Sequence, residues 1–509
     1  MPTSLFQYEM LPTTWFYLSS LMILATFFRF SRIFSIRNFD ILCLIISTPG
    51  LLYISMGQVR LGFLWIHAAG LIFFLRLFAD LFMTRRPLLE PNLALSGMIF
   101  AIVMLIVFFV PNLLLCRGDR VETPRTIRLD QLITTRALRD LRTGKPDPVM
   151  ENPGYRPFYL LSRKTEEIFL PSKEIQDQIE AKLAAAARNV SVPVVLHGSQ
   201  IGPFIHGAMS AKFSAFLGGR TPSAAPVPAE PERVAALPAE PNGRMTVEDY
   251  NRTHAALSED DLNRTPALDE FFLISFILLA QFGVVWGLVA VGHFHFGNLK
   301  MGFAAAMVYL LLPYVNQMPG SLENVVPGML LVMAVAIYRR PFFSGFLIGM
   351  AACLVFYPFF LIPLWCGFYL KRGFRRFLVG TFSAVMLMGL LLMFSPADYG
   401  PYSEQLASMF GLHSMCLTVP AGIWAFLPVY YRIPIIAAYL VICFGLCLWP
   451  PQKNLATLIA CSALLMLGVQ FWMGNLGGLY MGWYLPLLLL TFFRPNLEDR
   501  VAQTTVIEI

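Results

Sequence analysis

Charged residues are scarce in this chain. Asp, Glu, Lys and Arg make up only 14% of its 509 residues, whereas 57% are hydrophobic. A soluble domain carries about 25% charged residues, which its surface needs for contact with water. The composition therefore excludes an ordinary soluble protein and predicts a polytopic integral membrane protein.

Paired cysteine motifs are also absent. Most of the eight cysteines lie inside apolar runs, and the sequence contains no C-x-x-C. This excludes a disulfide framework or a zinc site as the basis of the fold, and no metal or cofactor is predicted. The net charge of +7 does not indicate nucleic acid as a partner, because the excess Lys and Arg flank apolar runs, where they orient membrane helices.

Long apolar runs, in contrast, are frequent, and they fall into two groups separated by a polar segment of about 150 residues. They predict an all-α polytopic membrane protein in a cell membrane (inner or plasma). The runs span residues 13–31, 40–57, 61–83, 93–115, 271–292, 299–316, 323–338, 341–370, 377–395, 431–449, 454–472 and 477–493.

The run 341–370 is too long for one crossing. As a single helix it would measure about 45 Å, against a hydrocarbon core of about 30 Å. A short-legged hairpin that turns near Tyr357-Pro358 fits better, because proline disfavours helix in the residue before it. Gly345 and Gly349 would let the first leg approach another helix closely. With two legs here, the sequence predicts thirteen membrane segments.

The positive charges fall into register with this count. With thirteen segments, the N-terminus lies outside and the C-terminus is cytoplasmic, because basic residues gather on the cytoplasmic side. Apart from the polar segment between the two groups of runs, only Arg60 and Arg432 fall on the outer side, and Arg76 lies within a segment. Fifteen cations share the cytoplasmic side: Arg29, Arg32, Arg37, Arg85, Arg86, Lys300, Arg339, Arg340, Lys371, Arg372, Arg375, Arg376, Lys453, Arg494 and Arg500.

Four regions follow from this pattern. They are an N-terminal four-helix membrane region (1–115), an external segment (116–269), a C-terminal membrane region (270–495) and a cytoplasmic tail (496–509). The external segment is predicted to be a small mixed insertion of helix and strand. Its Pro/Ala-rich stretch 219–243 is typical of an extended linker.

The stretch Gly297–Pro363 carries a resemblance. It contains "GFAAAMVYLLLPYVNQ", a short loop, an apolar helix, "YRRPFFSGFLIG" and "LVFYP". This order resembles the middle of the multispanning C-superfamily glycosyltransferases, especially bacterial polyprenyl-phosphate-mannose-dependent mannosyltransferases. The resemblance implies that a sugar is moved from a polyprenyl-phosphate-linked donor to an acceptor at the outer face of the membrane. It covers about 70 residues clearly.

In that superfamily an acid near the start of the first external loop is catalytic. The resemblance therefore assigns the general base to Asp119 or Asp130, because the acceptor hydroxyl needs a carboxylate within about 3 Å. A solvated flank of the membrane helix would explain these acids as well. The other assignments are donor-phosphate binding by Arg117, Arg120 and Arg125, and a substrate groove lined by Tyr314, Glu323 and Tyr357.

The sequence departs from the family at Val355, where the family usually has a lysine that meets the donor phosphate. Two other function classes therefore stay open. One is a non-enzymatic binder of lipid-linked glycans or an assembly scaffold. The other is a secondary transporter, which the small number of mid-membrane ionisable residues disfavours. The sugar, the acceptor and the oligomeric state are not indicated.

Three smaller patterns have structural interpretations. Arg76 and Asp80 are four residues apart on a predicted membrane helix and are expected to pair with each other. His293 and His295 are expected in the interfacial aromatic belt rather than at a metal. Trp472 and Tyr480 are of the kind that stacks on sugars, but lipid-belt residues would look the same.

Overall fold

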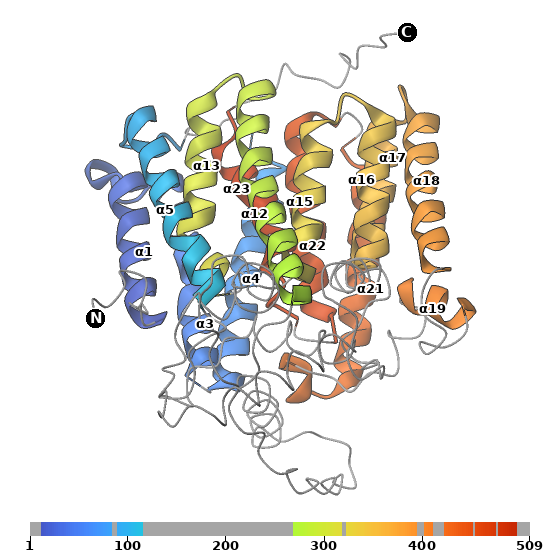
Figure 1. Cartoon of the computed structure of the whole chain (residues 1–509), viewed down its shortest axis with the longest axis horizontal. Helices are drawn as coiled ribbons and strands as arrows, with labels where there is room; N and C mark the ends of the chain where they lie inside the picture. Colours follow the sequence, from blue (N-terminus) through green and yellow to red (C-terminus); the bar gives the residue numbers. More distant parts are fainter. Residues whose placement is uncertain are drawn as a thin grey trace, which may run out of the picture.

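The computed structural model describes residues 12–56, 58–83, 89–115, 268–317, 322–393, 402–410, 422–450, 453–474 and 477–495. Every element in these ranges is an α-helix or a 3-10 helix. The long helices lie side by side with roughly parallel axes, and α1 and α18 lie at opposite edges (Figure 1). The predicted external segment lies outside the described residues, apart from its last two residues, 268 and 269, which open α12.

The elements follow the predicted apolar runs in order. Before residue 116 they are α1 (Pro12–Phe27), η1 (Phe30–Arg32), α2 (Ile36–Ile46), α3 (Thr48–Ser55), α4 (Val59–Asp80) and α5 (Leu95–Leu115). From residue 268 they are α12 (Leu268–Phe294), α13 (Leu299–Leu311), α14 (Pro313–Gln317), α15 (Leu322–Ala336), α16 (Pro341–Leu354), η3 (Tyr357–Leu361), α17 (Ile362–Tyr369), α18 (Phe374–Leu392), α19 (Tyr402–Met409), η5 (Gly422–Ala425), η6 (Val429–Tyr431), α21 (Arg432–Leu448), α22 (Leu455–Trp472), η7 (Met481–Trp483) and α23 (Leu485–Phe493).

Five of the described helical segments are long and apolar enough to cross a membrane. They are Ile36–Ile54, Val59–Asp80, Ser275–Phe294, Phe374–Leu392 and Leu455–Trp472. Shorter apolar helices pack among them. Because all backbone hydrogen bonds of a helix are internal, such segments are stable in lipid, and the chain is a helical membrane protein.

One end of the helical assembly is defined by contacts between the loops that connect the helices; we call it the basic end. The contacts are Asn92 N to Thr26 O (2.8 Å), Arg37 to the carbonyls of Phe27 and Glu90, Lys300 Nζ to Pro91 O (3.4 Å), His295 Nε2 to Ala336 O (2.6 Å), the Tyr369 hydroxyl to Tyr338 O, Lys453 Nζ to Cys447 O (2.9 Å) and Arg494 Nη2 to Asp80 Oδ2 (2.8 Å).

Most of the fifteen cations that the sequence analysis assigned to the cytoplasmic side lie at the basic end. Arg85, Arg86 and Arg500 lie outside the described residues, and the other twelve of the fifteen lie in these loops or in the adjoining helical turns. Arg60 and Arg432 begin or nearly begin helices that run toward the basic end, so they lie at the opposite end. The described members of the predicted cytoplasmic group therefore share one end of the structure, and which side of the membrane that end faces stays a prediction.

The run 341–370 forms the predicted hairpin. α16 ends at Leu354, Val355 is extended, and η3 starts the return at Tyr357. Its two ends meet, because a Cβ on Gly373 would lie only 2.6 Å from Pro341 Cγ. The first leg therefore starts at the basic end and the second leg returns to it. Neither leg has the length of a full crossing.

The predicted small-residue face of α16 packs against α18. A Cβ on Gly345 would lie 2.2 Å from Phe377 O, and one on Gly349 would lie 2.7 Å from Thr381 O. Gly380 of α18 approaches α16 in the same way, 2.0 Å from Phe342 O. Larger side chains would hold these backbones apart, so glycine is required for this close packing.

Two predicted segments differ in the structure. The run 477–493 is α-helical only as α23. It begins with a buried connection that contains the 3-10 helix η7, and in this connection Gly477 and Gly482 pass close to the backbone carbonyls of Gln470 and Asn324. The run 40–57 is divided into α2 and α3, with Pro49 in the first turn of α3. α2 also begins earlier than the run, at Ile36, where the Ser35 side chain accepts from Asn38 N.

Candidate functional site

Three helices begin inside the protein rather than at its surface. These are α15, the helical segment Tyr357–Tyr369 (η3 and α17) and α23, and all three run toward the basic end. The 15 residues of α15 span about 22 Å, less than the hydrocarbon thickness of about 30 Å. The N-termini of these three helices therefore lie between the two ends of the protein, at a level that the full-length helices cross on their way to the opposite end.

Trp483 connects these three N-termini. Its indole Nε1 donates to Glu323 O in the first turn of α15 at 2.8 Å. Its ring lies 5.4 Å from that of Tyr357, the first residue of η3, and 4.5 Å from that of Tyr480. Trp472, at the end of α22, lies 5.5 Å from Tyr357. We call Tyr314, Glu323, Asn324, Tyr357, Trp472 and Trp483 the Trp483 junction.

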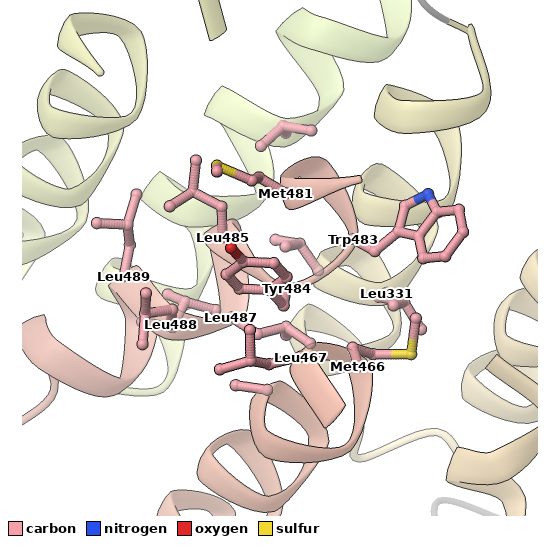
Figure 2. Packing of buried hydrophobic residues seen from close by; sticks show 14 of the residues in the cluster. Leu331, Met466, Leu467, Met481, Trp483, Tyr484, Leu485, Leu487, Leu488 and Leu489 are labelled. Atoms are coloured by element: carbon pink, nitrogen blue, oxygen red, sulfur yellow. The ribbon is translucent and has the colours of Figure 1, made fainter. Parts of the chain in front are cut away.

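Apolar packing holds the start of α23 in place on the side of the junction that faces the basic end. Trp483 and Tyr484 project in different directions from the connection that precedes α23 (Figure 2). Buried side chains from three helices surround that connection: Leu485, Leu487, Leu488 and Leu489 of α23, Met466 and Leu467 of α22, and Leu331 of α15 (Figure 2). Trp483 is therefore fixed from its backbone side, which gives its ring a defined position.

Backbone contacts bring α15 and η7 together at the same level. A Cβ on Gly482 would lie 2.3 Å from Asn324 O, and one on Gly328 would lie 2.1 Å from Gly482 O. No larger residue fits at either position without a backbone shift. The first turns of α15 and the turn before α23 are therefore in direct contact.

Several buried polar atoms at the junction have no hydrogen-bond partner among the residues that the structure describes. Both amide atoms of Asn324 lack one, and so do the Tyr314 hydroxyl and the Trp472 indole N–H. Asn324 is only 1% exposed and Tyr314 only 4%. Buried polar groups in native proteins are nearly always paired with protein, water or ligand, so this concentration marks the junction as a candidate binding site.

Arg432 adds positive charge beside the junction. Its Nε donates to Trp472 O at 3.0 Å, and its guanidinium lies 6.0 Å from the Trp424 ring. It packs flat against Gly474, whose Cβ would lie 2.9 Å from Nη2, and its charge acts on the Tyr357 hydroxyl. Arg432 is only 8% exposed, so its charge is poorly screened by water.

The structure brings the three residues of the predicted groove into one region. Glu323 and Tyr357 both contact Trp483, and Tyr314 interacts with the backbone of Met481 and Gly482 next to it. The predicted bases Asp119 and Asp130 lie outside the described residues, as do Arg117, Arg120 and Arg125. Val355, which replaces the lysine of the resembled family, is buried.

Sequence reasoning missed Arg432, Asn324 and Trp483 as members of a site. The one available signal was charge: Arg432 is one of only two cations that the positive-inside pattern left on the opposite side. Trp472 and Tyr480 are buried within the protein, so they do not belong to a lipid-facing belt.

A second polar cluster lies near the basic end and has a different character. Arg76 Nη2 donates to Asp40 Oδ2 at 2.8 Å, and Arg76 Nη1 donates to Asp80 Oδ1 at 3.2 Å. Asp80 also accepts from Arg494 Nη2 at 2.8 Å. We call these four residues the ionic cluster. The predicted Arg76–Asp80 pair is confirmed, and it is part of a network that joins α2, α4 and the end of α23.

The two histidines of "HFHF" lie in different environments. His293 is exposed, whereas His295 is buried, donates from Nε2 to Ala336 O and packs its ring 4.8 Å from Tyr338. His295 is therefore a packing residue between α12 and α15. The prediction that it belongs to the interfacial aromatic belt is wrong for this residue. No group of three potential metal ligands occurs within the described ranges.

No family model, curated protein or solved structure matches the chain. Its class rests on the structure itself. The protein is a helical membrane protein with three helix N-termini converging on a buried aromatic junction.

Proposed function

We propose that the protein transfers a sugar from a polyprenyl-phosphate-linked donor to an acceptor at the outer face of the membrane. The observation that carries the proposal is the convergence of three helix N-termini on Trp483. A helix N-terminus carries roughly half a positive charge and free N–H groups, so it favours an anion such as a phosphate.

The surroundings of the junction support an anionic lipid headgroup. Arg432 adds a full positive charge beside Tyr357, and Glu323 is the one acid of the junction. Tyr357, Trp472 and Trp483 offer aromatic faces and edges of the kind on which sugars stack. A site within the hydrocarbon thickness suits a donor whose polyprenyl chain stays in the lipid.

The orientation is part of the same proposal. The basic end faces the cytoplasm under the positive-inside rule, so the junction is reached from outside. α5 ends and α12 begins at the opposite end, so the segment between them starts and finishes on the side of the junction. Asp119 or Asp130 in this segment would act as general base on the acceptor, with Arg117, Arg120 and Arg125 near the donor phosphate.

A non-enzymatic binder of lipid-linked glycans is the second candidate. The observation that favours it is Val355, an apolar side chain at the hairpin turn where the resembled family has a cation. Arg432 offers a cation beside the same turn, which is why transfer remains the preferred function. Both functions require that the junction binds a lipid-linked phosphate, and only transfer requires turnover.

The test uses the purified full-length chain in nanodiscs. Wild type should bind polyprenyl phosphate and release sugar from at least one member of a panel of polyprenyl-phosphate hexoses. Arg432→Gln should weaken binding of polyprenyl phosphate about tenfold or more, because a charge-assisted contact to phosphate contributes roughly 1.5–3 kcal/mol. Binding without turnover of any donor would favour the binder, and absence of binding would contradict both functions.

Arg60→Gln is the matched control for this test. Arg60 is the other described cation at the opposite end, in the first turn of α4, but its side chain is exposed. It should leave binding unchanged, because an exposed charge is screened by salt and water. Equal losses in both variants would mean that net charge at this end, rather than the junction, attracts the lipid.

A further inference from the structure

Asn324 is the most unusual buried side chain in the described part of the protein. Its Oδ1 and Nδ2 are both inaccessible, and neither has a hydrogen-bond partner. An amide carries two N–H donors and an oxygen with two lone pairs, so up to four hydrogen bonds are unused. Its backbone is fixed in the first turn of α15 by the close contact of its carbonyl with Gly482.

Tyr314 is a second buried polar residue next to this connection. Its O–H finds no acceptor among the described residues, although the ring is almost fully buried. The hydroxyl oxygen lies near the backbone N–H groups of Met481 and Gly482. Two residues with unused hydrogen-bonding capacity, one from α14 and one from α15, therefore adjoin one short connection.

A nearby pair shows what the fold does when a buried amide is structural. Gln281 of α12 is also buried, and its Oε1 accepts from the Tyr309 hydroxyl at 2.7 Å. There an amide and a tyrosine satisfy each other. Asn324 and Tyr314 are likewise a side-chain amide and a tyrosine, but neither satisfies the other, which indicates that a further group belongs beside them.

We propose that Asn324 and Tyr314 bind the hydroxyl groups of the sugar carried by the donor, a hexose or related pyranose. This inference rests on the proposed function, and it assigns the sugar, as distinct from the phosphate, to the α14–α15 side of Trp483. Sugar hydroxyls donate and accept at once, so one hydroxyl can accept from Asn324 Nδ2 while a neighbour donates to Oδ1. The Trp472 indole N–H supplies a further unpartnered donor.

The experiment separates the phosphate from the sugar. Affinities of the purified full-length chain in nanodiscs are measured for polyprenyl phosphate and for polyprenyl-phosphate hexose, and their ratio is the sugar increment. Wild type should bind the hexose-bearing lipid at least about tenfold more tightly. Asn324→Leu should reduce that increment about tenfold and leave the affinity for polyprenyl phosphate unchanged, because it removes hydrogen bonds to sugar alone. Tyr314→Phe should reduce it less.

Thermal stability distinguishes a binding role from a structural one. Asn324→Leu replaces an unpartnered amide by an apolar group of similar shape, so the melting temperature without ligand should stay the same or rise. Gln281→Leu is the matched control. It should lower the melting temperature, because the Tyr309 hydroxyl loses its partner, and leave the sugar increment intact.

Four results would overturn the inference. A sugar increment that Asn324→Leu does not change would assign the amide to ordered water. A fall in melting temperature as large as that of Gln281→Leu would make Asn324 structural. Tight binding of polyprenyl phosphate with no sugar increment in wild type would remove the sugar subsite while leaving the phosphate site of the proposed function, whereas no binding of either lipid would end both.

Discussion

The ionic cluster and the Trp483 junction are both buried and both polar, but they treat their polar groups differently. In the ionic cluster, two carboxylates face two guanidiniums within 3.2 Å, and the Arg76 guanidinium also lies 5.4 Å from the Phe492 ring. At the junction, the amide of Asn324 and the O–H of Tyr314 have no partner among the described residues.

The difference separates structure from function. Charges inside a membrane protein are costly unless they are paired, and the ionic cluster pairs them between segments as distant as Asp80 and Arg494. It therefore fixes α2, α4 and the end of α23 relative to one another. The junction has the opposite property, because its unpartnered buried polar groups cost free energy, which under the proposed function a bound ligand offsets.

The two ends can be assigned to the two sides of the membrane by labelling. Single cysteines introduced at Ser199, in the segment between α5 and α12, and at Thr504, in the tail, should react from opposite sides of the membrane. An impermeant maleimide added to intact cells should label Ser199→Cys and not Thr504→Cys, an all-or-none difference. The wild-type protein, treated in the same way, measures the background labelling of the native cysteines. Labelling of Thr504→Cys alone from outside would invert the proposed orientation.

Breaking the ionic cluster should give the largest loss of stability. Arg76→Met leaves Asp40 and part of Asp80 buried without a counter-charge, so we expect a destabilisation of about 3–5 kcal/mol. Unfolding of the purified protein in detergent measures it. Arg60→Met, an exposed arginine on the same helix, should change stability by no more than about 0.5 kcal/mol. Equal behaviour of the two variants would show that the cluster does not hold the helices together.

Removing the general base should cost less free energy, but it should act on chemistry alone. Asp119→Asn keeps the shape of the side chain and removes its basicity, so the rate of sugar transfer should fall roughly a hundredfold or more. Binding of the donor and the melting temperature should not change, because a general base acts mainly in the transition state. Asp130→Asn is the parallel variant, and a loss confined to it would move the base to Asp130.

Local chemistry and charge made much of the fold predictable. The hairpin followed from the length of 341–370, from Pro358 and from the basic residues at both ends. The approach of α16 to α18 followed from Gly345 and Gly349, and the Arg76–Asp80 pair from helical spacing. In each case the relevant residues are near one another in the sequence, so no knowledge of the tertiary arrangement was needed.

The candidate site depended on contacts that the sequence does not encode locally. Trp483 and Glu323 are 160 residues apart, and Arg494 and Asp80 are 414 apart. The apolar run 477–493 also concealed the buried connection before α23, because its leucines and aromatics have the composition of a membrane helix. Hydropathy measures how apolar a segment is, but it does not show where a helix begins inside the protein.

The most direct test of the account is the cryo-electron microscopy structure of the protein in nanodiscs with a bound polyprenyl-phosphate hexose. The account predicts headgroup density at the Trp483 junction, with the phosphate toward Arg432 and the N-terminus of η3 and the sugar within hydrogen-bond distance of Asn324. Headgroup density at the basic end, or an empty junction with only water on Asn324, would contradict it.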